Sequence, residues 1–228
     1  MIFGCEHMKK LTAFSLVIVV LLSMFAVLPL VSAAESSVHG KVVVVYAIPP
    51  TDDSMTNPHY ELLSFHWYTT INYYINTKNK YGFSATAVVN TITTSANTWD
   101  VETSYQVFSY KGTTTRAAGR RDGRNVVAWG TYQAGVIAVT YIWYIGNKII
   151  ETDCRMNTYY GWSLSGQAGK MDVQNIMTHE FGHWCGLDDL YNDVDYWLTM
   201  YGYSNYGITY QRTLGLGDIN GLEDVYGP

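Results

Sequence analysis

The chain is short of charge, of cysteine and of proline. Of its 228 residues, 14% are charged, three are cysteines and five are prolines. Its 14 basic residues against 19 acidic ones give a formal net charge of −5, so it has no basic excess for binding nucleic acid. With 48% hydrophobic and 15% aromatic residues, the chain is too apolar for a disordered protein. The length allows one domain with a short extension, which we expect to be a monomer.

One long uncharged stretch lies near the N-terminus. Lys9 and Lys10 precede an uncharged run over residues 11–34. The small residues that end at Ala33 fit the rule for signal peptidase, so residues 1–33 are predicted to be a cleaved secretory signal. The alternative is an uncleaved anchor, because the run is just long enough to span a bilayer. We therefore expect a secreted, extracellular protein, or else a membrane-anchored one that faces outside.

Removal of this signal leaves two cysteines, Cys154 and Cys185. An even number of cysteines in an exported chain favours a disulfide, which would close a loop of about 30 residues. Two buried free thiols are the alternative. Both interpretations stay open, because the sequence does not give the separation of the two Cα atoms.

The hydrophobic pattern predicts one α/β domain over residues 63–228, preceded by an N-terminal segment or short propeptide over residues 34–62. Alternating or continuous apolar runs indicate five strands. Helical spacing after the cap residues Ser84 and Asp172, and again near the C-terminus, indicates two main helices and a final one. The predicted strands span residues 67–76, 105–110, 126–130, 136–145 and 149–157, and the predicted helices span residues 84–97, 172–185 and 218–226.

The most informative stretch begins with two histidines four residues apart, His179 and His183, on a predicted helix. This spacing puts both imidazoles on one helix face, where they can hold one Zn²⁺ ion. Glu180 projects beside the metal, where its carboxylate can take a proton from the activated water and pass it to a leaving amine. An amphipathic helix with two polar residues on its wet face is the alternative.

The residues that follow the helix favour the metal site. Gly186 lets the chain turn sharply where the helix ends. Asp189 then follows His179 by ten residues and is placed to return as the third ligand. A carboxylate oxygen is an acceptable zinc ligand, and three protein ligands leave the open position that catalysis needs.

Residues 179–189 resemble the extended HExxHxxGxxH/D signature of the metzincin metalloproteases. Metzincins also carry a methionine in a tight turn beneath the metal, and Met200 matches it. The flanks over residues 151–157 and 214–227 resemble the matrixins among them, and the likeness covers about residues 63–228. It implies a metzincin-like twisted mixed five-stranded sheet with two main helices and a small C-terminal subdomain that ends in a helix.

The resemblance also implies an activity. A peptide or protein substrate would lie extended along an edge strand, for which residues 136–144 are the candidate. Residues 201–210 would line the pocket beside the scissile bond, and Tyr201 or Tyr203 could stabilise the oxyanion. The metzincins that carry a tyrosine two residues after the methionine differ from this chain, which has Gly202 there.

Three departures from the matrixins stand out. The third ligand is Asp189 where matrixins usually have histidine, residues 34–64 contain no cysteine for a thiol switch, and no Ca²⁺ loop or structural-zinc cluster is recognisable. His39, His59 and His66 are interpreted as isolated polar residues. The first hypothesis is thus a secreted zinc endopeptidase, and the second is a surface protein of the same fold that binds zinc or peptides without cutting.

Overall fold

The structure is a computed structural model that describes residues 19–24 and 54–228. The predicted signal and N-terminal segment therefore lie largely outside the described residues. The fold is α/β: a mixed sheet, two helices packed on it and a C-terminal helix, as the hydrophobic pattern predicts. None of the helices in the described residues has the length and apolar character needed to cross a membrane.

The sheet has the strand order β1-β5-β6-β4-β2-β3. Strands β2, β3, β4 and β6 run parallel to one another, whereas β5 is antiparallel to β6. The strands are β1 (Val19–Met24), β2 (Ile71–Ile75), β3 (Phe108–Thr113), β4 (Asn125–Gly130), β5 (Val136–Ile145) and β6 (Lys148–Asn157), with a small parallel pair of β7 (Trp162–Ser163) and β8 (Met171–Asp172).

Strand β1 corrects one expectation about the sheet. It pairs antiparallel with β5, from Val19 opposite Ile142 to Met24 opposite Val136. Strand β5 is one of the two edge strands of the sheet over residues 63–228, as predicted, but its outer edge is not free in this structure. The backbone groups along that edge pair with an additional strand, as exposed strand edges do readily.

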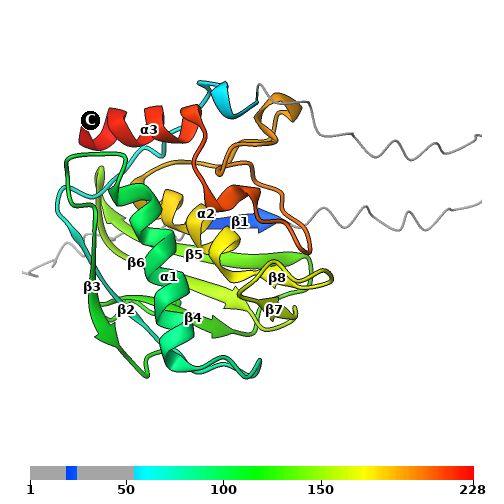
Figure 1. Ribbon diagram of the computed structural model, residues 1–228. Coiled ribbons are helices and arrows are strands. Elements are labelled where there is room, and N and C mark those ends of the chain that lie inside the picture. Colours follow the sequence, from blue (N-terminus) through cyan, green and yellow to red (C-terminus); the bar gives the residue numbers. More distant parts are fainter. Residues whose placement is uncertain (1–18, 25–53) are drawn as a thin grey trace, which may run out of the picture.

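Two helices, α1 (Ala85–Asp100) and α2 (Val173–Cys185), lie side by side on one face of the sheet (Figure 1). The Ser84 hydroxyl caps α1 as expected, by accepting a hydrogen bond from the amide of Ala87, and the helix runs three residues further than predicted. Short 3-10 turns η1 (Ser54–Thr56), η2 (Asp193–Asp195) and η3 (Tyr210–Arg212) and the helix α3 (Leu216–Tyr226) complete the fold.

Residues 55–63, which we call the strap, run between α3 and the end of α2. The amide of Leu63 donates to the carbonyl of Gly186 at 2.8 Å, and the amide of Asp188 donates to the carbonyl of Glu61 at 2.9 Å. A Cβ atom on Gly217 of α3 would overlap the His59 carbonyl, so a glycine is required where the strap crosses this helix. The strap is thus bonded to the chain on both sides of Leu187.

Candidate metal centre

Helix α2 begins and ends where the sequence predicts. The Asp172 carboxylate accepts a hydrogen bond from the amide of Asn175 at 2.9 Å, and Gly186 takes a left-handed conformation with φ 102°. Arg212 from η3 fixes the cap with contacts of 2.8 and 2.6 Å to the two Asp172 oxygens. The chain turns back after Gly186, and this turn brings Asp189 under the helix face that carries His179 and His183.

The structure brings together the three predicted metal ligands. One carboxylate oxygen of Asp189, Oδ1, lies 3.1 Å from His179 Nε2 and 3.6 Å from His183 Nε2. The three ligand atoms all lie within 4.8 Å of one another. Both histidines and the Asp189 side chain are buried, with 3%, 0% and 4% exposure. The cluster could therefore hold one metal ion.

The hydrogen-bond pattern tests this fit independently. The two Nε2 atoms and Asp189 Oδ1 are buried polar atoms without a hydrogen-bond partner in the described residues. The 3.1 Å contact between His179 and Asp189 is within ion-pair distance but lacks hydrogen-bond geometry. Unsatisfied buried polar atoms are costly, and these three face the same point. Two imidazole nitrogens and a carboxylate oxygen suit a transition metal such as zinc.

The backbone sets which ring nitrogen of each histidine faces the cluster. His179 Nδ1 lies 2.8 Å from the carbonyl of Thr199, and His183 Nδ1 lies 2.9 Å from the carbonyl of Leu187. A carbonyl can only accept, so each Nδ1 carries a proton, and Nε2 is the nitrogen of each ring that could bind a metal, which would displace any proton held there. This outer arrangement is typical of metal-binding histidines.

Buried charges also shift the acid–base equilibria of the ligands. Burial acts to lower the pKa of His179, but Asp189, Glu180 and the Thr199 carbonyl outweigh it and raise this pKa to about 9. Burial acts to raise the pKa of Asp189, but His183, His179 and Tyr191 outweigh it and lower this pKa. The Asp189 side chain is therefore held as a carboxylate, which is the form that binds a cation.

Met200 packs against Gly182 of helix α2, and its backbone is held by a residue that the sequence analysis missed. A Cβ atom on Gly182 would overlap the Met200 sulfur, so a glycine in α2 lets the methionine pack directly against the helix. The buried carboxylate of Asp218 accepts hydrogen bonds from the amides of Thr199 at 2.8 Å and Met200 at 3.0 Å. Because the Thr199 carbonyl in turn holds His179, Asp218 positions a metal ligand through the backbone.

Glu180 is fully buried and contacts the sheet. Its Oε2 accepts a hydrogen bond from the hydroxyl of Thr140 on β5 at 2.6 Å. Glu180 directly follows His179 and contributes to raising the pKa of that histidine, so its charge lies within electrostatic range of the cluster. The Glu180 carboxylate is therefore fixed by the sheet and lies near the candidate metal ligands.

Tyr191 was missed by the sequence analysis, yet it contacts a ligand. Its hydroxyl donates to the second oxygen of Asp189, Oδ2, at 3.0 Å. A Cβ atom on Gly202 would lie 2.5 Å from Cε1 of the Tyr191 ring, so the glycine after the Met200 turn leaves room for this ring. A parallel bridge between Leu190 and Tyr201 aligns the two segments. The spacing of Tyr191 two residues after the third ligand is a signal that could have identified it.

Tyr203 lies beside the ring of Tyr191, and Tyr201 lies beside Tyr203. Their rings are 5.5 Å apart, and the ring of Tyr203 lies 5.4 Å from that of Tyr191. The tyrosine that donates to a ligand side chain is thus Tyr191. A role of Tyr201 or Tyr203 as oxyanion donor stays a prediction.

The two cysteines correspond to the second interpretation, two buried free thiols. Cys154 on β6 lies with its sulfur 3.6 Å from the sulfur of Met177. Cys185 lies eight residues beyond Met177 on α2, about 12 Å along the helix axis. A disulfide needs Cα atoms about 4.4–6.8 Å apart, so of the two interpretations left open the Cys154–Cys185 disulfide is excluded in this structure.

His59 is also not the isolated polar residue expected from the sequence. Its Nδ1 lies 2.8 Å from Oδ1 of the buried Asp195, which also accepts a hydrogen bond from Asn57 at 2.8 Å. The hydrogen bond to Asp195 is the largest of the effects that raise the pKa of His59. These contacts attach the strap to η2.

No model of a known protein family and no curated protein sequence matches this chain.

Proposed function

We propose that the protein is a zinc-dependent metalloendopeptidase of the metzincin type, acting outside the cell on peptide or protein substrates. The observation that carries this proposal is the convergence of three unpartnered buried ligand atoms beside a buried glutamate. Zinc is the ion whose usual ligands match two imidazoles and one carboxylate with a position left open. When bound, it would supply Lewis acidity, which polarises a carbonyl and makes water more acidic.

The residues of the chain supply the remaining functions. His179, His183 and Asp189 would hold the ion, and the carbonyls of Thr199 and Leu187 fix the two rings. Glu180 would accept the proton of the attacking water and return it to the leaving amine. The Thr140 hydroxyl orients the Glu180 carboxylate from the sheet, at 2.6 Å.

Strand β5 would bind the substrate backbone. In the structure its outer edge already pairs with an antiparallel strand, β1, and Thr140 lies in the paired register opposite Leu21. An extended substrate would make the same type of backbone hydrogen bonds. Residues 19–24 and a substrate would then compete for one edge, so the chain without residues 1–33 should have a higher kcat/KM than the full chain.

The proposal is tested by measuring zinc by elemental analysis together with cleavage of an unstructured protein, with and without a chelator. We expect about one zinc ion per chain and cleavage that the chelator abolishes and zinc restores. Glu180→Gln should keep its zinc but lose about 10²–10⁴-fold in kcat, which is the usual contribution of a general base. Glu61→Gln, which alters an exposed glutamate of the strap, is the matched control.

Two results would contradict the proposal. Cleavage by Glu180→Gln within tenfold of the unsubstituted rate would exclude Glu180 as the base. Binding of zinc and peptide by the unsubstituted protein without any cleavage would point to the second hypothesis, a binding protein with the same site.

A further inference from the structure

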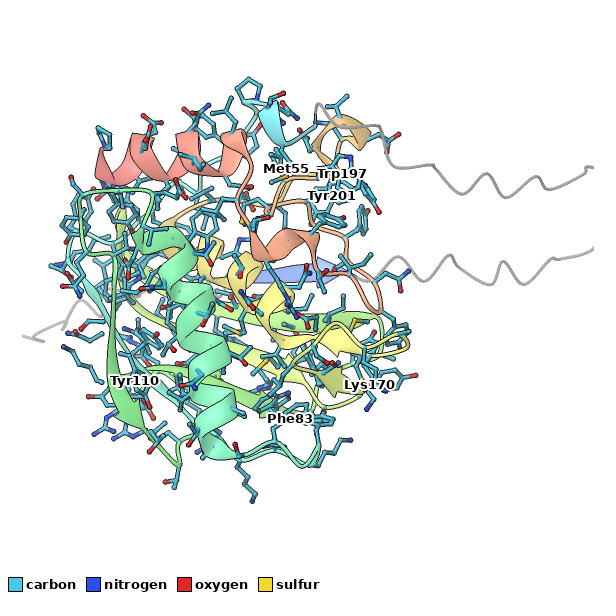
Figure 2. All side chains as sticks on the ribbon, in the orientation of Figure 1. Met55, Phe83, Tyr110, Lys170, Trp197 and Tyr201 are labelled. Carbon is cyan, nitrogen blue, oxygen red and sulfur yellow. The ribbon has the colours of Figure 1, made fainter. Side chains whose placement is uncertain are left out.

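A pocket that contains none of the metal ligands lies between α1 and the edge strand β3. It has a volume of about 310 Å³, which is enough for a small organic molecule. Figure 2 shows Tyr110, which belongs to β3, near this edge of the sheet. We call this space the α1 pocket, and its lining includes Tyr73, Asn97, Asp100, Gln106, Phe108 and Tyr110.

Asp100 brings to the α1 pocket a carboxylate that has no cationic partner. Its Oδ1 accepts hydrogen bonds from the amides of Val107 at 2.8 Å and Phe108 at 3.0 Å, whereas its Oδ2 has no partner in the part of the chain that the structure describes. No lysine, arginine or histidine lines the pocket. Burial raises the pKa of Asp100 although the two amides act to lower it, so a positive charge in the pocket would stabilise the ionised carboxylate.

The hydroxyl of Tyr73 is a second polar group with unused bonding capacity. Tyr73 is only 2% exposed, yet its hydroxyl makes no hydrogen bond within residues 19–24 and 54–228. Burial raises the pKa of Tyr73, and the nearby Asp100 and Tyr110 add to this, so both lie within electrostatic range of the hydroxyl. All three residues line the α1 pocket. A buried hydroxyl without a partner is costly, and a ligand in this pocket would supply the partner.

The remaining walls favour a positive charge with an apolar chain attached to it. The ring of Tyr73 lies 6.2 Å from that of Phe108 and 5.7 Å from that of Tyr110. Aromatic faces attract cations, and the rings also offer apolar surface to methylene groups. Asp100 is the last residue of α1, and the last turn of this helix has no basic side chain. The negative end of the helix dipole therefore adds to the attraction of a cation.

We propose that the α1 pocket binds an alkylammonium group, which pairs with the carboxylate of Asp100 and donates a hydrogen bond to the hydroxyl of Tyr73. The methylene chain would lie against the aromatic rings. A metal ion fits this lining less well, because Asp100 is its one carboxylate and it contains no histidine or cysteine. The ammonium group could belong to a free amine or to a lysine side chain. The inference does not depend on the proposed peptidase function.

Calorimetric titration of the full chain at pH 7 tests the proposal with four probes. These are n-pentylamine, Nα-acetyl-lysine methylamide, the uncharged 1-pentanol and the anionic pentanoate. We expect n-pentylamine to bind at least about tenfold more tightly than 1-pentanol, and pentanoate not to bind. Equal or tighter binding of the lysine derivative would assign the pocket to a lysine side chain, whereas weaker binding would assign it to a free amine.

Backbone amide NMR locates the binding site. Addition of n-pentylamine should shift the signals of the Val107 and Phe108 amides, because both donate to Asp100. The amide of Gly119 is the internal control, since it donates to a different buried carboxylate, that of Asp153, at 2.6 Å. Its signal should stay unchanged.

Two substitutions in the pocket and one outside it complete the test. Asp100→Asn should weaken the binding of n-pentylamine at least about tenfold, and Tyr73→Phe about two- to tenfold. Tyr73→Phe keeps the ring and decides the question if Asp100→Asn fails to fold. Glu102→Gln is the matched control, because it removes one acidic charge close to Asp100 in the chain from a residue that does not line the pocket.

Three results would overturn the inference. The first is binding of 1-pentanol as tight as that of n-pentylamine. The second is a loss of affinity in Glu102→Gln as large as in Asp100→Asn, or no loss in Tyr73→Phe. The third is a titration with n-pentylamine that leaves the amide signals of Val107 and Phe108 in place.

Discussion

The hydroxyl of Tyr191 provides a sharp test of the metal centre. In Tyr191→Phe the ring still fills the space beside Gly202 and still contacts Tyr203, but the hydrogen bond of 3.0 Å to Asp189 is lost. The second carboxylate oxygen of Asp189 then has no fixed donor, and the carboxylate can rotate away from the two Nε2 atoms. The substitution thus isolates one hydrogen bond to one metal ligand.

The expected effect follows from the nature of this bond. Loss of an outer partner of a metal ligand usually reduces metal affinity 10–100-fold, which corresponds to about 1.4–2.7 kcal/mol. The lower half of that range is expected here, because Tyr191 is 50% exposed and water can replace its hydroxyl. We therefore expect zinc to bind about 10–30-fold more weakly.

Competition with a chromophoric chelator at fixed pH measures this affinity directly, without reference to catalysis. Tyr203→Phe is the matched control, because its ring lies beside that of Tyr191 and it should leave the zinc affinity unchanged. At saturating zinc, kcat/KM of Tyr191→Phe should recover much of its loss. A zinc affinity of Tyr191→Phe within twofold of the unsubstituted protein would refute the reasoning.

Three further predictions concern stability. Gly182→Ala forces a Cβ atom into the sulfur of Met200, and urea unfolding should show a loss of about 1–3 kcal/mol. Asp153→Ala removes an acceptor from three backbone amides, with contacts of 2.6, 3.1 and 2.7 Å, and the same measurement should show a loss of about 2–4 kcal/mol; a loss below 1 kcal/mol would contradict this role. The pKa of His59 is raised from 6.5 in the folded state, so its pairing with Asp195 stabilises fully below that value and is lost as the pH rises through the folded-state pKa. The midpoint of thermal unfolding of His59→Gln should therefore lie below that of the unsubstituted protein at pH 5.5. The two midpoints should converge at alkaline pH.

The elements that carry local signals were predictable from the sequence. Helix α2 has a cap residue at one end and a left-handed glycine at the other, so its bounds match the prediction. Strand β5 has the predicted bounds because its apolar run is nearly continuous. The ligands His179, His183 and Asp189 come together because a helix face and one sharp turn suffice to place them.

Contacts between distant segments could not be predicted in the same way. Asp218 holds the backbone of Thr199, which lies 19 residues before it in the sequence. The ring of Tyr191 depends on the room left by Gly202, 11 residues further along the chain. The pairing of β1 with β5 joins segments more than 110 residues apart. Whether Cys154 and Cys185 form a disulfide could not be predicted either, because the distance between them depends on how α2 packs on the sheet.

The strap limits how the N-terminal part of this chain can be trimmed. Its backbone forms hydrogen bonds with Gly186 and Asp188, one on each side of Leu187, in the turn that leads to Asp189. Release of residues 34–62 as one propeptide would remove the bond to Asp188 and the anchor at Asp195 together. Maturation that yields an active enzyme should therefore cut before Met55, and a protease that cuts within the strap would inactivate the protein instead of activating it.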